Sequence, residues 1–120
     1  MEGPSKSFRD VLVWQKAHAF ALAIWRVSAS FPKEELFVIT AQLRRAAMSV
    51  PSNFVEGFRK RTKPDKIRFY NIAQGSADEC LYQLILANHL GYGDTTTLQA
   101  DLEEVSRLLQ GYINSLERNS

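Results

Sequence analysis

The sequence predicts an all-α fold, an antiparallel up-down four-helix bundle formed by one domain over residues 1–120. Three observations predict it. Apolar residues recur every three or four positions in four segments, which is the period of an amphipathic helix. Each segment is about 20 to 27 residues long, a length typical of bundle helices. The connections between the segments are short, and short connections place consecutive helices side by side and antiparallel.

The first helix is expected over residues 11–30. Its apolar face is formed by Trp14, Ala17, Ala21, Ile24 and Trp25. The following Phe31-Pro32 pair ends the helix, because proline disfavours helical geometry at the residue before it. The two tryptophans are eleven positions apart and so share one face, where we expect them to fill the core or an interface.

The second helix is expected over residues 37–58, although Pro51 lies within it. Its apolar stripe consists of Ile39, Leu43, Ala46, Ala47, Val50 and Phe54. The stripe keeps its phase across the proline, whereas a break between two elements would reset it. We therefore predict one helix with a kink at Pro51, at a cost of about 3 kcal/mol in an ordinary helix interior. Gly57 is expected near its end.

The third and fourth helices are expected over residues 64–90 and 95–118. Gly75 lies inside the third helix and costs roughly 1 kcal/mol relative to alanine. We therefore expect another group to pack closely against the backbone at Gly75. Cys80 lies on the apolar face of the same helix and is predicted to be a core residue.

The residues of a catalytic, cofactor or metal site are missing from the sequence. A di-metal carboxylate site in a four-helix bundle uses Glu-x-x-His pairs that face the core. Here Gln15 precedes His18 at that spacing, and Leu86 precedes His89. We therefore expect no enzymatic activity, no cofactor, no metal and no small-molecule substrate.

The location of the protein is predicted from its apolar segments. Residues 1–6 are not followed by the apolar core of a signal peptide. The longest purely apolar run, residues 19–25, is too short to span a bilayer. A single cysteine also fits a reducing compartment. We expect a cytoplasmic protein without membrane association.

Positive charge is concentrated in the first half of the chain. Residues 1–68 carry 13 Lys/Arg and 6 Asp/Glu, a net charge of +7, and residues 69–120 carry a net charge of −5. Six cations fall within ten positions, and we call them the basic segment: Arg59, Lys60, Arg61, Lys63, Lys66 and Arg68. They predict contacts with the phosphates of RNA or DNA.

Two other interpretations of the basic segment are open. It is a solvated loop and first helical turn, or it pairs with the acidic half of a neighbouring subunit. Phe58, Phe69 and Tyr70 flank it, and they either stack on exposed bases or pack in the core.

A second candidate surface is the polar side of the second helix. It carries Gln42, Arg45, Ser49, Ser52 and Glu56. This side is either a solvated face or a subunit interface. The small serines would let another helix approach closely.

Several stretches resemble one known family. They are residues 8–18 (FRDVLVWQKAH), 31–35 (FPKEE), 42–57 (QLRRAAMSVPSNFVEG) and 68–79 (RFYNIAQGSADE). They look like the bacterial four-helix bundle proteins named after 23S rRNA intervening sequences. The departures are mild: Phe54 and Val55 stand where the family more often has Ile and Ala, and Cys80 follows Glu79.

The resemblance implies a homopentameric ring without enzymatic activity. Reading frames of this type lie within insertions in large ribosomal RNA genes. A similar bundle is an accessory protein of diversity-generating retroelements, a basic pentamer that engages reverse transcriptase and nucleic acid. We therefore expect an oligomer that binds RNA, DNA or a nucleoprotein through the basic segment. The alternative is a purely structural or protein-interaction oligomer that binds no nucleic acid.

Overall fold

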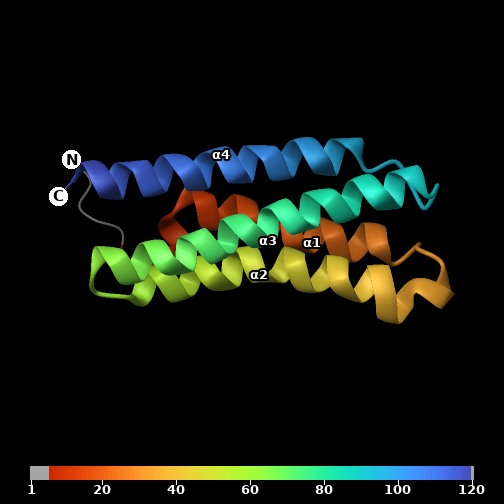
Figure 1. The fold of residues 1–120 in the computed structure, drawn as a ribbon, viewed down its shortest axis with the longest axis horizontal. Coiled ribbons are helices and arrows are strands. Elements are labelled where there is room, and N and C mark those ends of the chain that lie inside the picture. Colours follow the sequence, from red (N-terminus) through yellow and green to blue (C-terminus); the bar gives the residue numbers. More distant parts are fainter. Residues whose placement is uncertain (1–5, 120) are drawn as a thin grey trace.

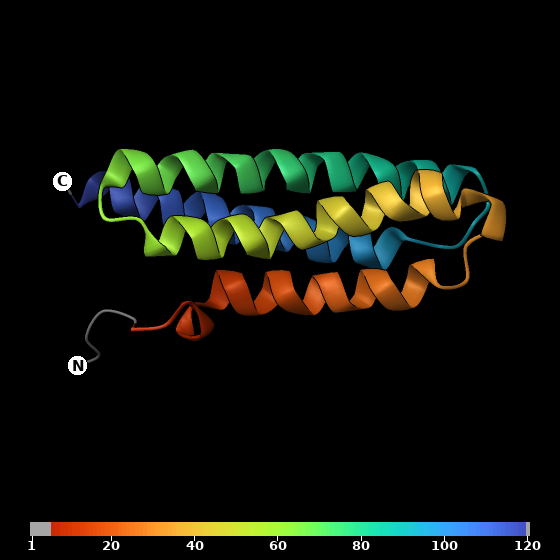
Figure 2. The same ribbon diagram turned by 90° about the horizontal axis from the view of Figure 1, so that it is seen from below.

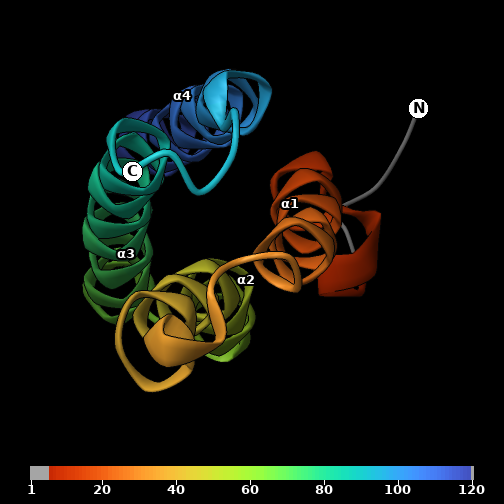
Figure 3. The same cartoon turned by 90° about the vertical axis from the view of Figure 1, so that its right-hand side faces the viewer.

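Four long helices form the structure, a computed structural model that describes residues 6–119. They are α1 (Leu12–Ser28), α2 (Ala41–Arg59), α3 (Lys63–His89) and α4 (Thr96–Arg118), shown in Figure 1. Each helix packs against the next, and α4 returns to pack against α1. Viewed along the bundle, the helices surround a common core (Figure 3). The predicted up-down four-helix bundle is confirmed.

Local signals explain where α3 begins and ends. Thr62 precedes its first turn, and its hydroxyl oxygen accepts a hydrogen bond from the Asp65 N–H at 3.3 Å. Pro64 occupies the first turn, where a missing N–H costs nothing. Gly91 has a φ of 78° just after the last turn, a conformation that glycine adopts without strain.

The segment before α2 is wound more loosely than an α-helix. A π-helical turn, Leu36–Thr40, leads directly into α2. From Ala41 onward α2 continues without interruption through Pro51, which is buried. The continuity predicted from the phase of the apolar stripe is therefore confirmed. The π-helical turn leaves Phe37 88% exposed at the tip of the bundle.

Aromatic rings connect three of the helices in the core. The ring of Phe54 on α2 lies 5.1 Å from that of Tyr70 on α3 and 5.3 Å from that of Tyr112 on α4. The Tyr70 and Tyr112 rings meet edge to face at 5.5 Å. Cys80 is fully buried in the same core, as predicted.

The structure tests two expectations about packing, one for Gly75 and one for the two tryptophans. A Cβ at Gly75 would have no neighbour within 4 Å, so the predicted close approach there is wrong. The close approach occurs at Gly57, in the last turn of α2, where a Cβ would lie 2.5 Å from Cε1 of Tyr70. Trp25 is 42% exposed and is not a core residue, whereas Trp14 is partly buried.

Two observations bear on the predicted location. Within residues 6–119, no helix has the length and apolar character needed to cross a membrane. Residues 1–5, part of the stretch from which a missing signal peptide was inferred, lie outside the described range.

Candidate nucleic-acid interface

The antiparallel bundle brings separate cations together at one end of the molecule. The start of α1, the end of α2, the start of α3 and the end of α4 lie there (Figure 2), and we call it the basic end. Its residues 6–10, 56–68 and 117–119 contain nine Lys/Arg and four Asp/Glu. At the opposite end, residues 29–36 and 88–96 contain one Lys/Arg and three Asp/Glu. The two ends of the bundle therefore differ in charge, and this difference is separate from that between the two halves of the sequence.

Two lysines of the basic segment donate hydrogen bonds to backbone carbonyls of the same chain. Lys66 Nζ donates hydrogen bonds to the carbonyls of Gly57 at 3.3 Å and Phe58 at 2.8 Å, which belong to the last turn of α2. A cation at this position offsets the partial negative charge of the helix end. Burial lowers the pKa of Lys66 from its ordinary value. Lys63 Nζ donates to the carbonyl of Asn119 and so connects α3 with the end of α4.

Two further cations of the basic segment contact an aromatic ring. Lys60 Nζ lies 5.1 Å from the centre of the Phe69 ring, and the guanidinium carbon of Arg68 lies 4.7 Å from it. Lys60 also lies 3.9 Å from the Glu56 carboxylate, one helical turn away. These contacts hold two positive charges close together beside the first turns of α3.

Three arginines keep their charge available. Arg59, Arg61 and Arg68 are exposed, and none of them takes part in the ion pairs found within residues 6–119. They are therefore the members of the basic segment best able to bind phosphates. Sequence reasoning did not include Lys6, Arg9 and Arg118, which the fold adds to the same end. The predicted antiparallel topology was the signal for them, since it places both chain ends beside the α2–α3 connection.

The three aromatic residues that flank the basic segment have different positions. Tyr70 is fully buried in the core, so it is unable to stack on a base. Phe69 is half-buried beneath Lys60 and Arg68. Phe58 packs partly against the core and also lines an open space at the basic end.

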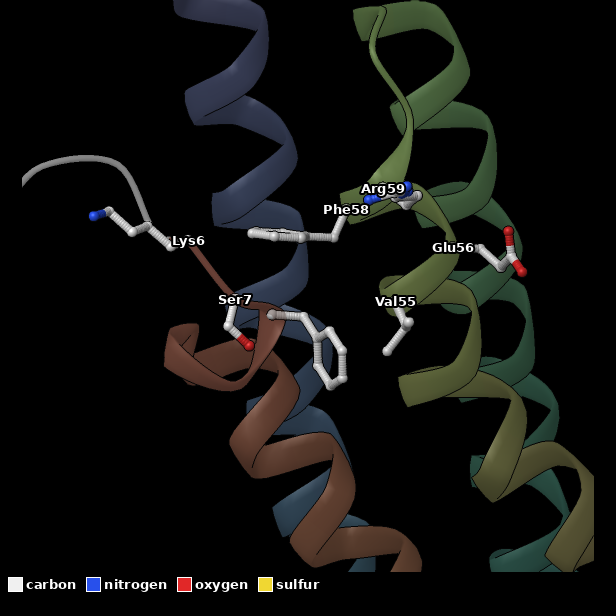
Figure 4. A pocket seen from close by; sticks show the side chains of 7 residues that line it. Lys6, Ser7, Val55, Glu56, Phe58 and Arg59 are labelled. Atoms are coloured by element: carbon white, nitrogen blue, oxygen red, sulfur yellow. The ribbon is translucent and has the colours of Figure 1, made fainter.

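That space, which we call the hollow, has a volume of about 490 Å³ (Figure 4). It is lined by Lys6, Ser7, Phe8, Val55, Glu56, Phe58 and Arg59. One wall is the short 3₁₀ turn η1 (Phe8–Asp10), whose start is capped by the Ser7 hydroxyl accepting from the Arg9 N–H at 3.2 Å. The other wall is the end of α2. In Figure 4 Glu56 points away from the hollow.

The polar side of α2 that was predicted as a subunit interface is only partly an outer face. Gln42, Arg45, Ser52 and Glu56 are exposed. Ser49 is different, because its hydroxyl lies 2.7 Å from that of Ser76 on α3. The structure therefore assigns Ser49 to the contact between α2 and α3 within one chain.

An apolar groove between α1 and α2 was not predicted. It has a volume of about 360 Å³ and is lined by Phe8, Trp14, His18, Ala21, Leu22, Trp25, Met48, Pro51, Ser52 and Val55. Leu22, Trp25 and Met48 are 46%, 42% and 51% exposed. Sequence reasoning missed the groove because the periodicity of α1 placed Trp25 with the core positions.

The metal-ligating side chains of the described residues do not gather into a cluster. Within residues 6–119, no group of three or more His, Cys, Asp or Glu side chains is arranged to hold a metal ion. The fold and site define a class, that of four-helix bundle proteins with a concentration of cations at one end.

A family match identifies the chain more closely. Residues 9–111 match the model of the 23S rRNA-intervening sequence protein family. The match spans well over half of the chain, so the chain belongs to that family. The resemblance seen in the sequence is confirmed.

A solved structure supports the same assignment. It is the crystal structure of a protein of unknown function from the S23 ribosomal protein family of Bacteroides thetaiotaomicron VPI-5482. The two chains are 26% identical, and their folds agree with a TM-score of 0.79. The similarity covers 85% of this chain and 98% of the other. The chain matches none of the curated proteins with which it was compared.

Proposed function

We propose that the protein is a non-enzymatic accessory protein that binds RNA, DNA or a nucleoprotein through its basic end. One observation carries the proposal: nine cations and only four carboxylates gather where the helices meet, and Arg59, Arg61 and Arg68 are exposed and outside the ion pairs found within residues 6–119. Such a surface attracts a polyanion and releases its condensed counterions on binding.

The binding is expected to be independent of base sequence. Arg59 lies in the last turn of α2, Arg61 in the connection and Arg68 in the second turn of α3, exposed positions suited to contact the phosphate backbone. Phosphate contacts orient a protein on nucleic acid but do not read its sequence. The affinity should therefore fall steeply with salt and differ little between sequences.

A filter-binding titration with RNA and DNA over a salt series tests this function. The triple variant Arg59→Ala, Lys60→Ala, Arg61→Ala should bind more weakly, and its slope of log K against log salt should shrink by about one for each phosphate that the variant no longer neutralises. The control triple is Arg26→Ala, Lys33→Ala, Arg107→Ala, which removes the same net charge from exposed positions outside the basic end. Absence of binding at low salt, or equal weakening in both triples, would contradict the proposal.

We further propose that copies of the chain assemble, as a homopentamer according to the resemblance, and cover the apolar groove. The observation that favours assembly is the row of Leu22, Trp25 and Met48, which are 46%, 42% and 51% exposed along one groove. A ring would also repeat the basic end, so that several weak phosphate contacts act together.

Light scattering tests the assembly. The double variant Leu22→Glu, Met48→Glu should have a lower molar mass than the wild type, because two carboxylates in an apolar contact are costly to desolvate. Leu90→Glu is the control, since Leu90 is 50% exposed in the loop at the opposite end. A wild-type protein that is monomeric at high concentration would rule the assembly out.

A further inference from the structure

We propose that the hollow at the basic end is a subsite for one unpaired nucleobase of a single-stranded nucleic acid. This proposal rests on the proposed function and adds the strandedness of the ligand and the place where a base is held. Three features support it: the lining of the hollow, the charges around it and the accessibility of a base.

The lining of the hollow suits a flat aromatic ligand. Phe8 and Phe58 contribute rings and Val55 contributes an aliphatic side chain. Every base has a face that stacks on aromatic side chains, whatever its identity. The volume of about 490 Å³ lies within the range of roughly 300–1,000 Å³ of small-ligand sites. One base with part of its sugar fits such a space.

The charges around the hollow select a nucleotide over an apolar peptide. Arg59, in the last turn of α2, and Lys6, in the segment before η1, both belong to the lining, and the Lys6 side chain extends away from the hollow in Figure 4. Among the described residues of the lining Glu56 is the only acidic one, and its side chain points away, with its carboxylate 3.9 Å from Lys60 Nζ. A phosphate next to a bound base would therefore meet positive charge.

Base pairing decides whether a nucleic acid can place a base in the hollow. A base in a duplex is stacked and paired, and extruding it costs a few kcal/mol. For a base in a single strand, the free-energy cost of leaving its neighbours is smaller. The hollow should therefore make the protein prefer single strands, whereas the arginines alone would bind single strands and duplexes through their phosphates.

Three probes of equal length separate the two contributions: oligothymidylate, the same backbone without bases, and a DNA duplex. Fluorescence anisotropy at fixed salt should give about tenfold tighter binding of oligothymidylate than of the abasic strand, the equivalent of one base stacked on an aromatic side chain. Phe58→Leu keeps an apolar side chain but removes the ring, and it should abolish this difference. Phe58→Tyr keeps the ring and should retain it.

A second variant fills the hollow without changing its charge. Val55→Trp should weaken the binding of oligothymidylate about tenfold and leave the abasic strand and the slope against salt unchanged. Because Val55 also lines the apolar groove, light scattering accompanies this variant. A changed molar mass together with unchanged oligothymidylate binding would show that the space is a contact between copies, and the subsite would be wrong.

The remaining outcomes are also decisive. Equal affinity of the wild type for oligothymidylate and the abasic strand would overturn the subsite, while phosphate binding by the basic end would stand. If none of the three probes binds at low salt, the proposed function itself fails.

Discussion

At Gly57 the backbone of α2 lies against the ring of Tyr70. A Cβ there would come within 2.5 Å of Cε1 and 2.8 Å of Cδ1 of that ring, and within 3.1 Å of the Lys66 carbonyl oxygen. The ring has no free direction in which to move, because Tyr70 is fully buried and packs against Phe54 and Tyr112. Glycine at this position is therefore a requirement of packing.

Two glycine substitutions test this view. Gly57→Ala should lower the free energy of unfolding by about 1–3 kcal/mol, the usual cost of overpacking a core. Gly75→Ala is the matched control in the helical part of α3, where a Cβ meets nothing within 4 Å. It should raise the free energy of unfolding by up to roughly 1 kcal/mol. Chemical denaturation measures both, and equal effects of the two substitutions would contradict the packing requirement.

The sequence predicted residues well where one pattern determined them. Cys80 was placed in the core by periodicity, and it is buried, with a thiol whose pKa burial raises to about 12. Gly57 was correctly placed near the end of its helix, but the close approach expected at Gly75 was wrong, and the one at Gly57 was not predicted. A single glycine in a helical pattern does not show what packs against it, since that depends on the neighbouring helix.

At the scale of elements, the loop before α4 is held by one buried threonine. Thr95 has no exposed surface, and its hydroxyl donates to the Leu84 carbonyl at 2.7 Å. Its own N–H donates to the Asn88 side-chain oxygen at 3.1 Å. These bonds connect the start of α4 with the body of α3.

Removing the Thr95 hydroxyl should therefore loosen the α3–α4 connection. Thr95→Val keeps the shape of the side chain but leaves the buried Leu84 carbonyl without this donor, and should cost about 1–3 kcal/mol. Thr97→Val, an exposed position in the same turn, should change stability by less than about 0.5 kcal/mol. Thermal unfolding followed by circular dichroism compares the two, and a Thr95→Val protein as stable as the wild type would refute the role.

The four helices could be predicted because their apolar stripes keep one phase over many turns, even across Pro51. The π-helical turn Leu36–Thr40 could not be predicted, because its apolar residues also fit an ordinary helical period. The hydrogen bonds that Lys63 and Lys66 donate to backbone carbonyls could not be predicted either. Both residues count as cations in the sequence, and only the folded chain shows which carbonyls they reach.

At the scale of the whole molecule, the sequence left open which partner the positively charged half of the chain binds. One alternative was that the basic segment pairs with the acidic half of a neighbouring copy. If the apolar groove holds the assembly together, its molar mass should stay constant or rise with salt, because burial of apolar surface is not weakened by screening. Light scattering from low to high salt measures this. Dissociation on adding salt would favour the electrostatic alternative.

The sequence predicted that the candidate site is basic, but it did not predict all the residues that belong to it. Clustering in the sequence found Arg59, Arg61 and Arg68, which are local neighbours. The hollow escaped notice because Phe8 and Phe58 are fifty residues apart and meet only through the packing of η1 beside α2. The place of Trp25 in the apolar groove likewise depends on the packing of α1 beside α2, which the sequence does not show.

The basic end has an effect at distances beyond contact. The molecule is 48 Å long, with excess positive charge at one end and excess negative charge at the other. The dipoles of antiparallel helices largely cancel, so these side chains set the permanent dipole moment along the long axis. In the field of a polyanion the molecule experiences a torque that turns its positive end forward before the surfaces touch. If the basic end binds nucleic acid as proposed, this orientation precedes collision, and the rate of association should depend on ionic strength more than the rate of dissociation does.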